Sequence, residues 1–322
     1  MKPILGPGRT GCRGFGRPVP GDEAIVRNVT VVVATRDRAG TLVRTLDRLR
    51  RLPDRADLIV VDNASTDGTP ELIRREFPDA RVLPLPRNHG AAGRNLGVAA
   101  AATPYVAFAD DDSWWEPGAL TAAARLFDGY PRLGLIAART LVGPDDRLDP
   151  MSAFMAGAPL GRADDLPGPS VLGFLACAAV VRREAFLRCG GFDPVVFFMG
   201  EEGRLAYDLA AAGWGLAYCA EVTAHHDPPP CADPAAKRLL AARNAALTAW
   251  MRRPVRVAAA QTRALLRARP DPPTLAQFAV RVPRALARRR APDPAVEAGH
   301  ALLAQACRGG GRRGAASGGW SR

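Results

Sequence analysis

Residues 106–115 read VAFADDDSWW, an apolar run followed at once by three carboxylates and two tryptophans. The run has the length and content of a buried strand, so Asp110, Asp111 and Asp112 should lie where that strand ends, the edge at which open α/β sheets bind ligands. Carboxylates at this spacing can hold a hard cation such as Mg²⁺ or Mn²⁺ and leave positions for phosphate oxygens. A solvated turn or a helix cap is the alternative, but neither gives a reason for the two tryptophans. The stretch therefore predicts a site for a metal ion and a diphosphate.

The chain before these acids alternates between β-branched runs and helical patterns. Leucines recur at helical spacing over 42–52, Thr69 can cap a helix that opens with Pro70, and small residues over 91–102 suit a third helix. The strands predicted around these helices cover 29–34, 58–61, 81–85 and 105–109. Such alternation predicts a parallel sheet with right-handed crossovers.

The chain after the acids is less regular. A Pro/Gly/Asp-rich passage over 143–170 is typical of a mobile loop over a site, and 171–181 has the pattern of a buried strand. Gly190 and Gly191 should stop a short helix over 183–189. The remaining predicted elements are helices over 117–127 and 201–212 and strands over 134–138 and 214–219.

The composition indicates a globular protein of the cell interior. Apolar residues make up 48% of the 322 residues, enough for a sizeable core. The longest central apolar run, 171–181, is too short to span a bilayer, and the N-terminus lacks an apolar signal region, so export is not expected. The six cysteines show no CxxC pairing, which favours reduced thiols and a cytoplasmic location.

The net charge of +12 is unevenly distributed, and its location decides what it implies. Residues 231–322 hold 18 basic residues against 4 acids and 1–28 hold 5 against 2, whereas 29–230 hold 21 against 26. We therefore expect a disordered basic segment over 1–28, an acidic catalytic α/β domain over 29–230, an Ala/Arg-rich helical extension over 231–307 and a disordered tail over 308–322. Basic tails argue for a surface partner, not for the chemistry.

Polar clusters also follow the first two predicted strands. Thr35, Arg36 and Asp37 follow the first strand, and Asp62 with Asn63 follows the second. A carboxylate at this position suits hydrogen bonding to a base or ribose, although it can equally cap the next helix.

Three further features have both a functional and a structural interpretation. Gly93 and Arg94 open a predicted helix, where backbone N–H groups and the guanidinium could meet a diphosphate, or Arg94 could be a surface residue. Glu201 and Glu202 begin another helix, where acids either favour the helix dipole or supply a general base. His225 and His226, at the exit of the last strand, are either structural residues or metal ligands.

Taken together, these segments resemble family 2 glycosyltransferases of the GT-A fold. The resemblance covers roughly 29–230 and is specific in the order of its pieces, which are 31–38, 60–69, 88–97, 108–113, 183–193 and 200–202. It implies a mostly parallel, Rossmann-like sheet flanked by helices, here with a helical C-terminal extension. It also implies an inverting transfer of sugar from a nucleotide-diphospho-sugar to a hydroxyl acceptor with Mg²⁺ or Mn²⁺.

The resemblance assigns roles residue by residue. It places the nucleoside at Thr35, Asp37 and Asp62, and it matches Asp110 and Asp112 to the DxD motif that contacts ribose and metal. The other residues expected to bind the nucleotide-sugar are Arg36, Asn63, Gly93, Arg94 and Asp111. Of the three acids, Asp111 is expected to tolerate substitution best.

Two late features complete these assignments. Either His225 or His226 matches a late histidine that touches the metal or the diphosphate in some family members. Glu202 matches the general base, but the family pair is most often Glu-Asp, so the Glu-Glu here leaves the base open between Glu201 and Glu202. Ala34 also stands where proline is common, a change that a strand tolerates.

Competing functions remain for the same residues. A sugar-nucleotide nucleotidyltransferase usually has a glycine-rich phosphate loop after its first strand, whereas 35–38 contain no glycine. A catalytically weak nucleotide-sugar-binding protein is a further alternative. Specific nucleic-acid binding is not expected, because the positive charge lies in the tails. Peripheral contact of the basic C-terminal region with anionic lipid at the inner face of the membrane is expected, with an extension without function as the alternative.

Overall fold

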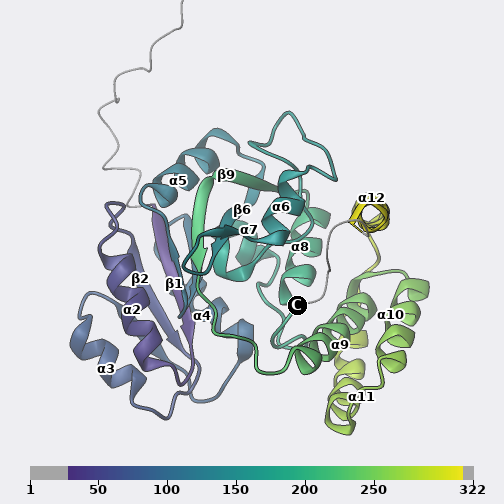
Figure 1. The fold of residues 1–322 in the computed structure, drawn as a ribbon, viewed down its shortest axis with the longest axis horizontal. Helices are drawn as coiled ribbons and strands as arrows, with labels where there is room; N and C mark the ends of the chain where they lie inside the picture. Colours follow the sequence, from purple (N-terminus) through teal and green to yellow (C-terminus); the bar gives the residue numbers. More distant parts are fainter. Residues whose placement is uncertain (1–27, 315–322) are drawn as a thin grey trace, which may run out of the picture.

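The computed structural model describes residues 28–314, with side chains as far as Arg308. Within that part the chain forms a nine-stranded sheet in the order β3-β2-β1-β4-β8-β6-β9-β5, with β7 paired to β6. Helices cover both faces of the sheet (Figure 1). The predicted α/β class is therefore confirmed. The disorder predicted over 1–28 lies outside the described residues, apart from residue 28. The disorder predicted over 308–322 also lies outside them from residue 315, while residues 308–314 belong to a helix that extends to Gly314.

The first half of the sheet is parallel and matches the predicted strands. It consists of β1 (Val29–Thr35), β2 (Asp57–Asp62), β3 (Arg81–Pro84) and β4 (Tyr105–Asp110). The connections are α2 (Ala39–Arg50), α3 (Thr69–Glu76), and α4 (Gly93–Ala100) after the 3-10 turn Gly90–Ala92. The order places the switch point of the sheet between β1 and β4, so the carboxyl ends of these strands form the ligand-binding edge.

The second half of the sheet runs mostly antiparallel. Strand β8 (Ala179–Arg182) is antiparallel to β4 and to β6 (Leu133–Val142), whereas β9 (Gly215–His226) is parallel to β6 and antiparallel to β5 (Ser113–Trp115). The other elements here are α5 (Ala119–Gly129), β7 (Arg147–Leu148), α6 (Pro150–Ala156), the 3-10 turn Ala176–Ala178, α7 (Arg183–Arg188) and α8 (Glu201–Ala211).

Three local predictions need correction. The apolar run 171–181 is a strand only from Ala179, because its first residues are buried by packing and not by strand pairing, a distinction that an apolar run does not carry. The passage 143–170 is not a bare loop, since it contains β7 and α6. Helix α3 is capped by Gly68 and not by Thr69. The cap position has a left-handed backbone (φ 78°), a conformation that glycine adopts without steric cost.

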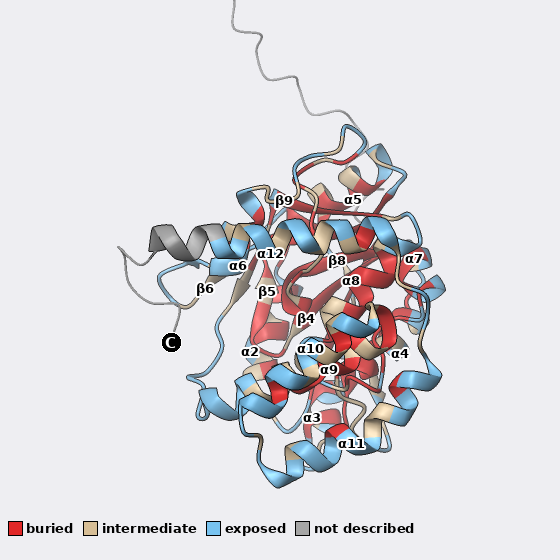
Figure 2. Ribbon diagram, turned by 90° about the vertical axis from the view of Figure 1, so that its right-hand side faces the viewer, coloured by how far each residue is buried: buried red, intermediate tan, exposed pale blue. Residues whose placement is uncertain are grey.

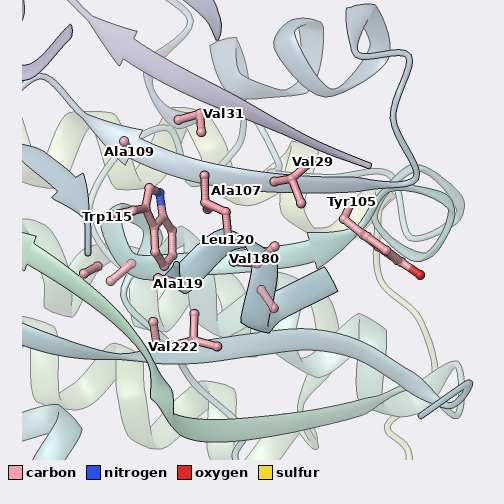
Figure 3. Close-up of a cluster of buried hydrophobic side chains, with 14 of the residues drawn as sticks. Val29, Val31, Tyr105, Ala107, Ala109, Trp115, Ala119, Leu120, Val180 and Val222 are labelled. Atoms are coloured by element: carbon pink, nitrogen blue, oxygen red, sulfur yellow. The ribbon is translucent and has the colours of Figure 1, made fainter. Parts of the chain in front are cut away.

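The sheet is buried on both faces (Figure 2). Alternate residues of β1 divide between two clusters: Val31 and Val33 pack with α2, α3 and α5, while Val32 packs with α4, α7 and α8. Figure 3 shows part of the first cluster, where Trp115 lies among small and branched side chains of β4 and α5. Buried side chains on both faces hold the strand ends at fixed positions relative to one another.

The C-terminal part is helical, as predicted, and it packs on the α/β body. It consists of α9 (Pro234–Arg252), α10 (Val255–Arg267), α11 (Pro272–Ala287) and α12 (Pro294–Gly314), with the first three grouped at the end of the molecule opposite α2 and α3 (Figure 1). Their apolar cluster includes Val195 and Val196, which precede α8. No helix of the described part is long and apolar enough to cross a bilayer.

Candidate active site

A cavity of about 590 Å³ lies at the carboxyl ends of β1 and β4, between the start of α4 and the start of α8. It gathers predicted site residues from segments far apart in the sequence. Those that line it are Thr35, Arg36, Asn63, Arg94, Asp110, Asp111, Asp112, Glu201, Glu202 and His226. The predicted residues Asp37, Asp62, Gly93 and His225 do not line it.

The three acids are held by different partners. Asp110 ends β4 and forms an ion pair with the buried Arg94, while its backbone N–H donates to Ser113 Oγ at 2.7 Å. Asp111 accepts a hydrogen bond from Thr35 Oγ1 at 3.0 Å. Burial raises the pKa of Asp111 to about 6, with the charge of Arg38 opposing the shift.

Asp112 lies beside a guanidinium and an imidazole. Arg38 Nη1 lies 3.2 Å from Asp112 Oδ2 and 3.0 Å from Asp111 Oδ1, and His226 Nε2 lies 3.5 Å from Asp112 Oδ1. Burial acts to raise the pKa of Asp112, but His226 and Arg38 together lower it below its ordinary value. The pKa of Asp112 is thus shifted in the direction opposite to that of Asp111. Arg38 was not among the predicted site residues, although its place just beyond the 35–37 cluster was a signal for it.

The glutamate pair lines the same cavity. Glu201 is 3% exposed, and its Oε2 has no hydrogen-bond partner among the described residues. Burial, reinforced by the charge of Glu202, raises the pKa of Glu201 to about 8. Burial also raises the pKa of Glu202, although a backbone hydrogen bond from Ala176 and the charge of Arg94 oppose it. A carboxyl group with a raised pKa is suited to taking up a proton near neutral pH.

The β2 side of the cavity depends on a close backbone approach. Asn63 Oδ1 accepts from His89 N at 3.1 Å, and its Nδ2 donates to Gly90 O at 3.3 Å. A Cβ on Gly93 would lie 2.7 Å from Asn63 Oδ1, so any larger residue there would displace the Asn63 amide. Gly93 thus supports the wall without lining the cavity.

Two predicted carboxylates organise loops beside the cavity. Asp62 Oδ2 accepts from Ser65 N at 3.0 Å, while its buried Oδ1 has no partner in the described part of the chain. Asp37 Oδ1 accepts from Thr66 N at 2.7 Å, and Asp37 also pairs with Arg36 at 3.3 Å.

The two histidines point to opposite sides, because both lie within β9 and successive strand residues alternate in direction. His226 faces the acids. His225 instead bonds Asp146 at 2.9 Å, pairs with Glu116 and stacks on Trp114 at a centroid distance of 5.3 Å. The predicted position past the strand end was wrong, since β9 continues to His226.

Some of the side chains at the cavity are suitable ligands for a hard divalent cation. The Asp112 carboxylate and the His226 imidazole lie within reach of one ion, and Asp110 lines the same cavity. Across the described residues no three His, Cys, Asp or Glu side chains already form a metal-binding group. Arg38 forms an ion pair with Asp112 and Arg94 forms one with Asp110. Metal binding would therefore require these ion pairs to rearrange.

Comparison with known proteins bears on this arrangement. The model of the family "Glycosyl transferase family 2" matches residues 30–190, which include β1, β2, β4 and the acidic run. The chain belongs to this family. It is similar to N-acetylglucosaminyl-diphospho-decaprenol L-rhamnosyltransferase of Mycobacterium tuberculosis, with 30% identity over 231 residues that cover 61% of this chain and 75% of the relative. It is also similar to pre-mycofactocin glycosyltransferase of the same organism, with 32% identity over 217 residues that cover 65% of this chain and 45% of the relative.

The fold of this glycosyltransferase is also found in solved structures. Mannosyltransferase PcManGT from Pyrobaculum calidifontis, in complex with GDP-Man and Mn²⁺, superposes with a TM-score of 0.56 at 22% identity, over 87% of this chain and 79% of the other. The likeness confirms the predicted GT-A type of fold. The curated relatives are named as glycosyltransferases, so the chain is a transferase of that class.

Proposed function

We propose that this glycosyltransferase moves a sugar from a nucleotide-diphospho-sugar to a hydroxyl of a lipid-linked acceptor, by a metal-assisted single displacement with inversion. The observation that carries the proposal is one cavity lined by two kinds of carboxyl group. Asp112, whose pKa is lowered, lines it together with Glu201 and Glu202, whose pKa values are raised.

The donor would lie along the acidic run. Asp110, Asp112 and His226 would hold Mg²⁺ or Mn²⁺, and the cation supplies charge neutralisation for the leaving diphosphate when bound. Arg38 and Arg94, displaced from the acids, would bind phosphate oxygens. The base and ribose would lie toward Thr35, Arg36 and Asn63, with Asp37 and Asp62 organising the loops beside them.

The acceptor would approach from the side of Glu201 and Glu202. A glutamate there takes the proton of the attacking hydroxyl, which reaches the anomeric carbon from the side opposite the leaving diphosphate and so inverts it. We assign the base to Glu202, with Glu201 as the alternative. Both have raised pKa values, which suits uptake of a proton.

A lipid-linked acceptor is supported by the apolar side of the cavity and by the relative named for a diphospho-decaprenol substrate. The apolar lining includes Leu175, Phe197, Phe198, Met199 and the prolines 228–230, and the basic lining includes Lys237. Apolar and basic residues in one cavity suit a prenyl chain joined to a diphosphate.

Contact with anionic lipid would bring the enzyme to such an acceptor. The outer face of α10 exposes Arg256, Arg263 and Arg267 beside Val255 and Leu266, which are 58% and 50% exposed. Replacing the three arginines by glutamate should abolish sedimentation with vesicles that contain anionic lipid and leave transfer to a detergent-soluble acceptor unchanged. Unaltered sedimentation would exclude this face.

The catalytic assignment is tested by Asp112→Ala and Glu202→Gln, each of which should abolish transfer in purified protein. Thermal-shift measurements with UDP-, GDP- and dTDP-sugars and Mn²⁺ identify the donor, and NMR of the product reports the anomeric configuration. Most of the activity surviving in either variant would overturn the assignment. Stabilisation by a nucleoside triphosphate and a sugar phosphate, with none by any nucleotide-sugar, would favour a nucleotidyltransferase.

A further inference from the structure

The segment 195–200 joins the cavity to the C-terminal helices. We propose that Asn244 and Arg281 are positioning residues that impose the reactive conformation on this segment and thereby place Glu201 and Glu202. The inference rests on the proposed function of the glutamate pair, and it assigns the helices after residue 230 a part in catalysis.

The segment has an unfavourable backbone. Phe197 and Met199 have φ values of 71° and 70°, in the left-handed region that side chains with a Cβ avoid, and Gly200 follows at 79°. These residues lead directly into α8, which begins at Glu201. Such conformations persist only where surrounding contacts impose them. The contacts that do so here determine where the glutamates point.

The strongest contacts come from α9. Asn244 is 0% exposed, and its Nδ2 donates to the carbonyl oxygens of Phe198 and Met199, the latter at 2.7 Å. Its Oδ1 accepts from Arg243 Nε at 3.0 Å and Nη2 at 2.9 Å, which leaves the amide only one orientation. One buried amide therefore binds both carbonyls on either side of a strained residue.

A second contact comes from α11. Arg281 Nη1 donates to Val195 O at 2.9 Å and to Val196 O at 3.3 Å, and its guanidinium lies 5.4 Å from the centroid of the Phe197 ring. Arg281 thus fixes the first part of the segment, as Asn244 fixes the second.

The segment is also fixed on its other side, next to the predicted donor site. Ala91 N donates to Phe197 O at 2.7 Å, and a Cβ on Gly90 would lie 2.4 Å from the same oxygen. Phe198, 48% exposed, lines the cavity between these contacts. The segment therefore links the turn before α4, the glutamates and the C-terminal helices.

Helix α8 has an anchor that does not involve Asn244. Asp208 forms ion pairs with Arg204 at 2.6 Å and with Arg252, and these side chains are at most 4% exposed. Loss of the Asn244 amide should therefore release the segment and the first residues of α8, and leave α8 packed in place from Arg204 onward. This separates a positioning role from a general structural one.

The test compares Asn244→Ala with Thr248→Val. Thr248 lies one turn further along α9, and its buried hydroxyl has no hydrogen-bond partner in the described residues. We expect kcat of Asn244→Ala to fall at least tenfold with the donor KM within twofold of wild type, and amide exchange over 195–200 to increase. Thr248→Val should match wild type in all three measurements.

Arg281→Gln and Arg281→Lys give an independent measurement. We expect Arg281→Gln to lower kcat, and Arg281→Lys, which keeps a donor to the two carbonyls, to restore part of it. Wild-type kcat in both Asn244→Ala and Arg281→Gln would overturn the inference, as would a loss of donor binding in step with kcat. A wild-type enzyme that transfers no sugar would refute the proposed function instead, whereas normal amide exchange in Asn244→Ala would refute the inference alone.

Discussion

The buried Glu201 carboxyl should make the stability of this enzyme fall as the pH rises. Its pKa is raised from 4.5 to about 8, mainly by burial, so the folded state retains a proton that the unfolded state releases. Stability from this group is fully present below pH 4.5 and is lost as the pH rises through about 8. At about 1.4 kcal/mol per pKa unit, the difference between pH 4.5 and pH 8 is on the order of 4 kcal/mol.

Glu201→Gln removes the titration and keeps the shape of the side chain. Urea unfolding at several pH values should show the variant close to wild type at pH 5 and more stable by about 4 kcal/mol at pH 8. Glu184→Gln, at an exposed position on α7, controls for the loss of one negative charge. A difference between Glu201→Gln and wild type that stays constant from pH 5 to pH 8 would refute the raised pKa, and with it the argument that Glu201 or its neighbour takes up a proton near neutral pH.

Three substitutions test how the cavity is held. Gly97→Ala should destabilise the protein by about 2–3 kcal/mol in urea unfolding, because its Cβ would lie 2.4 Å from a valine of β1 and 3.0 Å from a valine of β2. Wild-type stability of this variant would contradict the close packing of α4. Gly93→Ala should raise the donor KM at least tenfold with little change in the unfolding midpoint, since it displaces the Asn63 amide. An unchanged KM would show that Asn63 takes no part in donor binding. Asp54→Ala should cost about 2–4 kcal/mol of stability, because the buried carboxylate accepts hydrogen bonds from Gly118 N and Thr121 N at the start of α5. Donor binding should stay intact. A loss of donor binding, measured by calorimetry on folded protein, would refute a purely structural role.

The parallel half of the sheet was predictable because its physical signal is local. Strands buried on both faces appear as continuous apolar runs, and the polar residues after them, such as Thr35, Asn63 and Asp110, must lie at one edge. That reasoning found the acidic run, which lines the cavity with Thr35 and Asn63. The glutamate pair begins helix α8 and was found from the start of a predicted helix and from the family resemblance, not from strand direction.

The other parts of the site depend on contacts that no local pattern contains. Which histidine faces the acids depends on the register of β9, and a shift of one residue exchanges His225 with His226. Arg38 pairs with acids more than seventy positions away. Asn244 meets carbonyls 45 and 46 positions earlier. The division of the chain at residues 230 and 231 stays a prediction, and the contacts of Asn244 and Arg281 cross that boundary.

These long separations have a consequence for synthesis. Proteins are made from the N-terminus, and early parts of a domain can fold while later parts are still absent. The strands that carry the acidic run are complete by Asp110, but the residues that fix segment 195–200 arrive only with α9 and α11. Nascent chains should therefore complete the acidic run long before the contacts that fix segment 195–200. Under the function proposed above, a chain interrupted before α11 would lack Arg281 and transfer sugar more slowly, so the ribosome would release a fully active enzyme only near the end of translation.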